Sequence, residues 1–209
     1  ARTSPPLALR ALALLTTDLE RAGMIKYPAK ASLATEITFI NGIAGLGERT
    51  GADVKEVSRG IGLDGRIGNK FLHAGPGYGG SCFPKDTAAL ARIGQDHAYP
   101  MQITETVIRV NDQVKQRMIE KLRDACDGTF NGKVIAVLGV TFKPNTDDMR
   151  DAPSLTLIPA LIGGGAKVRV VDPQGRAEGE ALLPGVKWLD DPYQAVSLEP
   201  PAGAGGRSE

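Results

Sequence analysis

The run KVIAVLGV, Lys133–Val140, decides the fold class of this chain. It holds valine, isoleucine and leucine almost without interruption, as strands covered on both faces do. The segment SLTLIPALIGGG (154–165) reads as a helix that stops at glycines, with Pro159 either at its start or at a kink. A second strand, AKVRVVD, follows at 166–172, and VKWLD at 186–190 is a candidate third one. Strand, helix and strand in this order predict a parallel α/β unit.

Helical periods dominate the chain before this unit. Apolar residues recur at helical spacing from 31 to 48 and again from 101 to 126. Asp53 and Glu56 have the spacing of a capping box before a short helix that ends near Gly60. After a long glycine-rich loop, Pro84 marks the start of another helix. The stripe in the 101–126 helix comprises Ile103, Val107, Val110, Val114, Met118 and Leu122.

The sequence thus predicts a mixed fold with three segments. These are an all-helical central domain at 1–100, a connecting helix at 101–128, and a partial Rossmann-like α/β domain at 129–209. Two or three strands are few for an independent doubly wound sheet. Asp172 ends the second strand, and a structural role or a role on the nucleotide side is expected for it rather than ribose binding. The proline- and glycine-rich tail SLEPPAGAGGRSE, 197–209, is predicted to be disordered.

Composition excludes several classes of function. The 209 residues carry a formal net charge of +1, which gives no reason to expect a nucleic-acid or membrane-surface partner. The sequence has no run of about 18 apolar residues, so no membrane span is predicted. The apolar N-terminus lacks a cleavage site and is interpreted as non-secretory. The two cysteines, Cys82 and Cys126, make no disulfide framework, and a reducing cytoplasm fits them best. No metal site is expected.

The motif GPGYGGSCFPKDTAAL, 75–90, concentrates chemistry around one cysteine. Cys82 lies at a predicted helix N-terminus, where free N–H groups and the helix dipole favour a thiolate. Lys85 adds a positive charge, and Asp86 falls on the first turn, where a carboxylate can position water or move a proton. The preceding glycines allow close backbone approach to a ligand. An isolated cysteine is more often an inert buried residue, but this combination favours a nucleophile.

This motif resembles the nucleophile segment of the UDP-glucose/GDP-mannose dehydrogenase family. Two further stretches carry the same resemblance, MIKYPAKASLATEITFINGIAGLGE at 24–48 and VLGVTFKPNTDDMRDAPSL at 137–155. The resemblance runs from about residue 17 to 195. It implies a cytoplasmic oxidoreductase that converts UDP-glucose to UDP-glucuronate with two NAD per substrate, for polysaccharide biosynthesis. The motif SCFPKD favours UDP-glucose over GDP-mannose or UDP-N-acetylmannosamine as the nucleotide sugar.

The resemblance also implies roles for individual residues. Cys82 would be the nucleophile that holds the aldehyde as a thiohemiacetal and then as a thioester. Lys26 would stabilise the oxyanion or help to move the proton, Asp86 would assist water or proton transfer, and Lys85 and Arg150 would contact NAD. The resemblance also implies a homodimer, in which Arg66 reaches the sugar site of the partner subunit. The residues matched to UDP-glucose binding are Lys26, Arg66, Phe71, Leu72, His73, Ala74, Gly75, Gly79, Phe142 and Lys143.

Three departures from the family pattern leave an alternative open. No G-x-G-x-x-G follows a strand, so the chain is expected to be a fragment without the N-terminal NAD-binding domain. The family asparagine four residues after Lys26 is Lys30 here, and Gly42, Gly45 and Gly47 interrupt a predicted helix at about 1 kcal/mol each. The alternative to a dehydrogenase fragment is therefore a catalytically inactive module for dimerisation or nucleotide-sugar binding.

Overall fold

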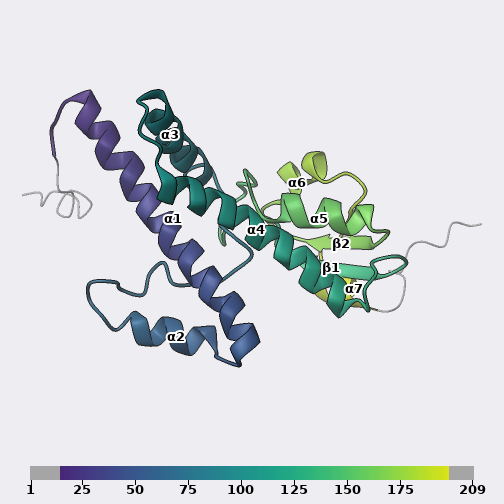
Figure 1. The fold of residues 1–209 in the computed structure, drawn as a ribbon. Coiled ribbons are helices and arrows are strands. Elements are labelled where there is room, and N and C mark those ends of the chain that lie inside the picture. Colours follow the sequence, from purple (N-terminus) through teal and green to yellow (C-terminus); the bar gives the residue numbers. More distant parts are fainter. Residues whose placement is uncertain (1–14, 198–209) are drawn as a thin grey trace, which may run out of the picture.

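The computed structural model describes residues 15–197, which form a helical part followed by a small α/β part (Figure 1). The helical part consists of α1 (Leu19–Thr50), α2 (Val54–Ile61), α3 (Phe83–Asp96) and α4 (Gln102–Ala125). The α/β part consists of β1 (Val134–Leu138), α5 (Ser154–Gly163), β2 (Lys167–Val171), α6 (Arg176–Leu182), β3 (Lys187–Trp188) and α7 (Pro192–Val196). The predictions for the N-terminus and for the tail after 197 lie outside the described residues.

The longest helix, α1, crosses the whole helical part (Figure 1). Its 32 residues span about 48 Å. The Asp18 carboxylate accepts the N–H of Arg21 at 2.8 Å and so caps its first turn. The helix begins at Leu19, well before the predicted residue 31, so Pro28 lies inside it. Pro28 has no N–H to donate to the carbonyl of Met24, four residues earlier. Met24 is 58% exposed, so water can donate to that carbonyl instead.

Packing explains two of the glycines in α1. The guanidinium of Arg117, from α4, occupies the space that a Cβ at Gly45 would need. Arg117 Nη2 also donates to the carbonyl of Asn41 at 3.2 Å, which ties α4 to α1. At Gly47 a Cβ would lie 2.5 Å from the carbonyl oxygen of Ala52, where the chain folds back after the helix. These two glycines lower the stability of the helix, but they allow close contacts that the side chain of alanine would prevent.

The predicted connecting helix forms as α4, and it runs from the helical part to the α/β part (Figure 1). Its buried face differs from the predicted stripe, because Ile103 is 73% exposed. The residues that α4 buries are Thr104, Val107, Asn111, Val114 and Ile119. Helices α1, α3 and α5 of the same chain pack against α4. The buried apolar residues of α4 thus pack inside the chain, and the two polar residues Thr104 and Asn111 share their face.

Both predicted strands and the short third one form a parallel sheet in the order β1-β2-β3. Val134 pairs with Lys167 in β1 and β2, and Arg169 pairs with Lys187 in β2 and β3. Helix α7 contacts β1 and β2, and α5 contacts β2. The fully formed core of this part comprises Ile119, Phe130, Val140, Met149, Ile158, Leu161, Ala166, Val168, Val170 and Leu183.

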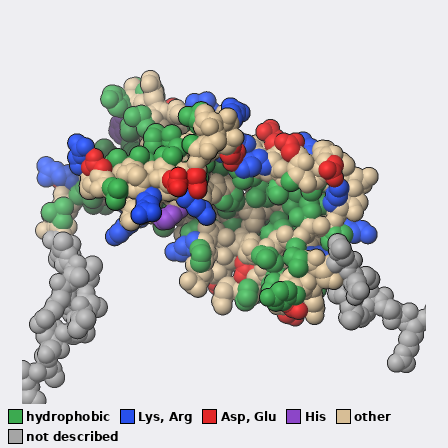
Figure 2. Space-filling view, turned by 90° about the horizontal axis from the view of Figure 1, so that it is seen from below, with side chains coloured by type: hydrophobic (Ala, Val, Ile, Leu, Met, Phe, Trp, Pro, Cys, Tyr) green, Lys and Arg blue, Asp and Glu red, His purple; other side chains and the backbone are tan. Residues whose placement is uncertain are grey.

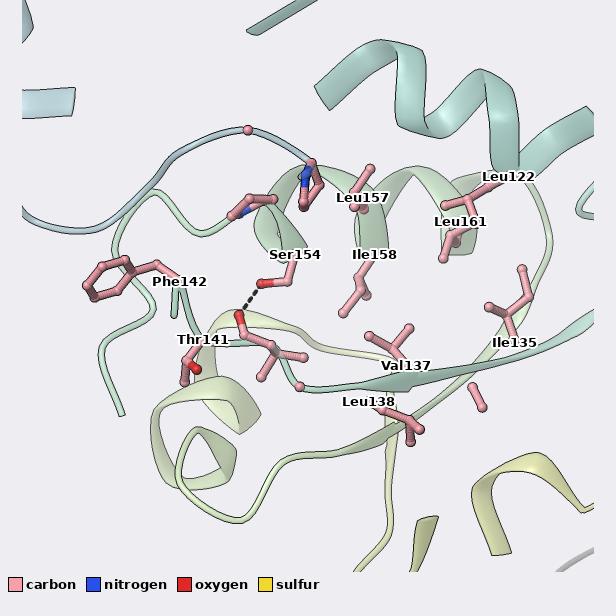
Figure 3. Close-up of a pocket in the computed structure, with 16 residues that line it drawn as sticks. Leu122, Ile135, Val137, Leu138, Thr141, Phe142, Ser154, Leu157, Ile158 and Leu161 are labelled. Atoms are coloured by element: carbon pink, nitrogen blue, oxygen red, sulfur yellow. Dashed lines mark hydrogen bonds between the residues drawn. The ribbon is translucent and has the colours of Figure 1, made fainter. Parts of the chain in front are cut away.

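An apolar cavity of about 400 Å³ lies between β1 and α5 (Figure 3). Leu157, Ile158 and Leu161 of α5 face Ile135 and Val137 of β1 across it (Figure 3). The Ser154 hydroxyl donates to the carbonyl of Val140 at the first turn of α5. Helix α5 begins at Ser154, so Pro159 lies within the helix and not at its start.

Asp172 connects three segments at the end of β2. Its carboxylate accepts the N–H groups of Val140 at 2.7 Å, Thr141 at 3.4 Å, Gln174 at 2.9 Å and Gly175 at 2.8 Å. Burial alone would raise the pKa of this carboxyl, but the backbone N–H bonds together hold the pKa below its ordinary value. Both carboxylate oxygens are occupied, which supports the structural role expected from the sequence.

We expect Asp172→Asn to lower the free energy of unfolding at pH 7 by about 1–3 kcal/mol, because an amide N–H would face N–H donors. A carboxyl with a lowered folded pKa stabilises the fold above its unfolded pKa of about 4, and this contribution is lost as pH falls through the folded value. Urea unfolding at pH 7 and pH 3 measures both effects. The variant should lose less stability between the two pH values, and an unchanged pH dependence would contradict this role.

Candidate functional site

Cys82 is exposed and occupies the N-cap position of α3. The N–H of Asp86 donates to its carbonyl at 2.8 Å, which closes the first helical turn. Pro84 lies in that turn, where its missing N–H costs no hydrogen bond. The Cys82 Sγ lies 3.8 Å from the Ser81 hydroxyl. The thiol therefore lies at the positive end of a helix, as the sequence predicts.

Lys26 and Asp86, predicted to act with the cysteine, form an ion pair between α1 and α3. The Lys26 Nζ lies 3.2 Å from Asp86 Oδ1, and the carboxylate is only 1% exposed while the lysine side chain is 54% exposed. Asp86 Oδ2 is buried without a hydrogen-bond partner among residues 15–197. One turn along α1, Lys30 lies over the ring of Phe83 at 5.8 Å. Two lysines of α1 thus face the start of α3.

A cavity of about 280 Å³ opens beside this centre, between the helical part and the α/β part. Five of its residues were predicted to bind substrate, namely Phe71, His73, Gly79, Phe142 and Lys143. The remaining lining comes from Ile37, Lys70, Gly77, Tyr78 and Phe83. Aromatic and apolar walls with cations at a few places suit a ligand that carries both rings and phosphates.

A second hollow, of about 590 Å³, shares Phe142 and Lys143 with this cavity. It lies at the carboxyl ends of β1 and β2, with Thr141, Asn145 and Asp172 in its wall. Open α/β sheets bind ligands outside the carboxyl ends of their strands. The two hollows adjoin at Phe142 and Lys143, which line both, so together they are the candidate region for an elongated ligand.

The glycines before Cys82 bring the loop close to the α/β part. The N–H of Gly80 donates to the carbonyl of Arg150 at 2.7 Å. A Cβ at Gly80 would lie 2.6 Å from the ring of Phe142, and one at Gly79 would collide with the carbonyl of Asp151. The sequence predicts close backbone approach to a ligand here, whereas at these two positions the close neighbour is protein.

Five predicted substrate residues lie outside the cavity lining, and one of them is Lys26, which pairs with Asp86. Leu72 is 3% exposed and packs inward, and Ala74 does not line the cavity. The N–H of Gly75 is already donated to Asn41 Oδ1 at 2.8 Å. The Arg66 side chain is 90% exposed and pairs with Asp64 at 2.6 Å. Within one chain, therefore, Arg66 does not join the group around Cys82.

The two predicted NAD contacts, Lys85 and Arg150, are exposed cations. Arg150 donates to Asp148 through Nε at 2.9 Å and through Nη2 at 2.8 Å. These side-chain bonds lower the pKa of Asp148 to about 2 and, with a smaller contribution from Cys82, raise the pKa of Arg150. Within residues 15–197 Lys85 forms no ion pair. Two such cations fit the phosphates of a dinucleotide by charge.

Sequence reasoning missed Asn41, Asn111 and Tyr78. Asn111 Oδ1 accepts the N–H of Tyr78 at 2.8 Å, and its Nδ2 donates to the carbonyl of Tyr78 at 3.1 Å. The sequence signal that could have revealed Asn111 is its position as a polar residue within the apolar pattern of α4. Across residues 15–197, no helix has the length and apolar character that crossing a bilayer needs. The same residues contain no cluster of His, Cys, Asp and Glu able to hold a metal ion.

Two family models match consecutive segments of the chain. The central-domain model of the UDP-glucose/GDP-mannose dehydrogenase family matches residues 20–113. The UDP-binding-domain model of the same family matches residues 136–198. The segments correspond to the helical part with the first half of α4 and to the α/β part, so the cavity around Phe142 lies between two modules of one family.

Individual relatives agree with these matches. A UDP-glucose 6-dehydrogenase of Rhizobium meliloti is 52% identical over 192 residues, which are 92% of this chain and 44% of that protein. The UDP-glucose 6-dehydrogenase TuaD of Bacillus subtilis is 49% identical over 88% of this chain and 40% of its own length. A UDP-glucose dehydrogenase structure from Pyrobaculum islandicum superposes with a TM-score of 0.82 at 37% identity, covering 87% of this chain and 42% of that one. The chain thus spans less than half the length of these relatives.

Proposed function

The chain belongs to the UDP-glucose/GDP-mannose dehydrogenase family, and on this premise we propose that it carries the substrate centre of an NAD-dependent UDP-glucose 6-dehydrogenase. The observation that carries the proposal is the convergence of Cys82 and the Lys26–Asp86 pair, next to a cavity walled by Phe142 and Lys143. These residues come from α1, α3 and the α/β part. The names of the relatives favour UDP-glucose over other nucleotide sugars.

Each residue has a task in the proposed oxidation of the C6 alcohol to a carboxylate. When bound, NAD supplies the hydride acceptor for both oxidations. After C6 has lost its first hydride and its hydroxyl proton has passed to water, the Cys82 thiolate bonds to the aldehyde carbon and gives a thiohemiacetal. Lys26 stabilises the resulting oxyanion by its positive charge. Loss of the second hydride leaves a thioester on Cys82.

Water completes the reaction by adding to the thioester carbon and releasing the thiol and UDP-glucuronate. Asp86 supports this step, because its Oδ1 holds Lys26 and its buried Oδ2 has no partner within residues 15–197. A free carboxylate oxygen can accept a proton from the attacking water. Cys82 is regenerated at the start of α3 for the next cycle.

We propose a homodimer that uses the outer surface of α1. Phe39 is 56% exposed and Leu46, two turns later, is 57% exposed. Leu63 and Ile67, in the segment after α2, are 82% and 49% exposed. Figure 2 shows hydrophobic side chains grouped at several places on one face, between charged side chains. A partner on α1 would bury such residues, and it would bring Arg66 to a second copy of the site.

A module that binds a nucleotide sugar without turnover is the second candidate. Lys30 supports it, because a second cation on the Lys26 face of α1 changes the charge around the nucleophile. The apolar side chains of α4 give it less support, since α1, α3 and α5 already pack on that helix. Together, the cysteine, the ion pair and the cavity favour the dehydrogenase centre.

We expect UDP-glucose to slow the alkylation of Cys82 by iodoacetamide at least tenfold, because a ligand in the adjacent cavity covers an exposed thiol. A Cys126→Ser background leaves Cys82 as the only thiol, and intact-mass measurements follow its modification. GDP-mannose at the same concentration is the specificity control. Equal alkylation rates with and without UDP-glucose would contradict the proposed site.

A further inference from the structure

The loop that leads to Cys82 is held by two buried asparagine amides from two helices. Asn41 of α1 accepts the N–H of Gly75, and Asn111 of α4 engages both backbone groups of Tyr78. Asn41 is 1% exposed and Asn111 is 3% exposed. A buried amide that pairs with both the N–H and the carbonyl of one residue fixes that peptide segment as a neighbouring strand would.

Further contacts indicate that the backbone at Tyr78 is held against Asn111. Gly77 has φ of +106°, and a Cβ there would lie 3.0 Å from Asn111 Oδ1, so glycine allows the amide to approach. The Tyr78 side chain is buried with Ala34 and Val107, and Val107 lies one turn before Asn111 on α4. Backbone and side chain of Tyr78 are thus anchored to the same helix.

From Tyr78 this anchoring extends to the nucleophile. The Tyr78 ring meets the ring of Phe83 edge-on at 5.8 Å, and Phe83 directly follows Cys82. Gly77, Tyr78, Gly79 and Phe83 all line the cavity beside the cysteine. A displacement of Tyr78 would therefore change both the shape of the cavity and the place of the thiol.

We propose that Asn111 is a positioning residue, which holds the 75–81 loop so that the cavity and Cys82 keep their relative places. This inference rests on the proposed function for its ligand, UDP-glucose, but it concerns a residue that touches neither substrate nor thiol. It also assigns a task to a polar residue on the buried face of α4 that helix stability alone does not require.

The test uses the full chain and two readouts. We expect Asn111→Ala to raise the Kd for UDP-glucose at least tenfold in calorimetry and to speed amide hydrogen exchange in peptides covering 75–81 at least tenfold. Asn111→Asp keeps an acceptor for the Tyr78 N–H but loses the donor to its carbonyl, and we expect a Kd at least threefold above that of the unchanged chain.

Two controls separate positioning from general destabilisation. Gln113→Ala removes an exposed amide from the same helix and should leave both readouts within twofold. Val168→Ala opens the buried core of the α/β part, so it lowers global stability without touching the loop. Measurements are made at a temperature at which every variant is folded by circular dichroism.

The outcomes decide between a positioning role of Asn111 and general destabilisation of the fold. A Kd for Asn111→Ala within twofold of that of Val168→Ala would overturn the positioning role. If the unchanged chain does not bind UDP-glucose, the proposed function fails, and hydrogen exchange alone then decides the positioning role. If amide hydrogen exchange in 75–81 is unchanged in Asn111→Ala, the positioning role is overturned in that case as well.

Discussion

Gly80→Ala should lower the free energy of unfolding by about 2–4 kcal/mol and remove the protection of Cys82 by UDP-glucose. Gly80 has φ of +84°, and a Cβ there would lie 2.6 Å from the ring of Phe142. Its N–H donates to Arg150 across the boundary between the helical and α/β parts. The new methyl group would push Phe142 out of the cavity wall or break this contact. Urea unfolding and the alkylation assay measure the two effects.

A matched control separates backbone strain from lost packing. Gly68 also has a positive φ, +77°, but no atom lies within 4 Å of the position of its Cβ. Gly68→Ala should therefore cost only the strain of the left-handed conformation, about 1 kcal/mol, and leave the alkylation assay unchanged. Equal losses for the two variants would show that contact with the α/β part contributes nothing.

Removal of Lys26 should give the second large effect. Lys26→Met leaves the Asp86 carboxylate, which is 1% exposed, without its cation. We expect the free energy of unfolding to fall by roughly 2 kcal/mol. This lies between the effects of breaking an exposed and a buried ion pair, because the lysine is half exposed. Adding Asp86→Asn removes the uncompensated charge and should recover at least half of that loss. Thermal and urea unfolding of both variants measure it.

The control pair for this prediction lies on the surface. Lys121 pairs with Glu48 at 2.5 Å, but both side chains are almost half exposed. Lys121→Met should change the free energy of unfolding by less than about 1 kcal/mol. A loss in Lys26→Met no larger than that in Lys121→Met, or no recovery on adding Asp86→Asn, would contradict the importance of the buried carboxylate.

Local signals were sufficient to predict most elements of the fold. Continuous apolar runs gave β1 and β2, and Pro84 and Asp53 marked the starts of α3 and α2. Asp53 caps α2 by accepting the N–H of Lys55, and its position in the sequence was enough to predict this. The extent of α1 was not predicted, because the helical spacing of apolar residues is evident only from residue 31, whereas the helix begins at Leu19.

The candidate site could be predicted only where it followed a motif. The motif containing Cys82 and Asp86 was evident, and the family resemblance supplied Lys26. Pairing of a lysine and an aspartate 60 positions apart depends on how α1 packs on α3, which spacing alone does not reveal. Asn111 was missed because an apolar stripe was expected, and the buried face of α4 holds polar residues that bond to backbone.

The contact between Gly80 and Arg150 also sets an order of events during folding. The two residues are 70 positions apart (150 − 80), and β1 lies between Arg150 and the helical part in the chain. A contact over such a separation requires closure of a long loop, which is slow compared with helix formation. We therefore expect a folding chain to form α3, with its cysteine at the first turn, before Phe142 and Lys143 arrive to complete the cavity. The thiol becomes part of a site only at a late stage of folding.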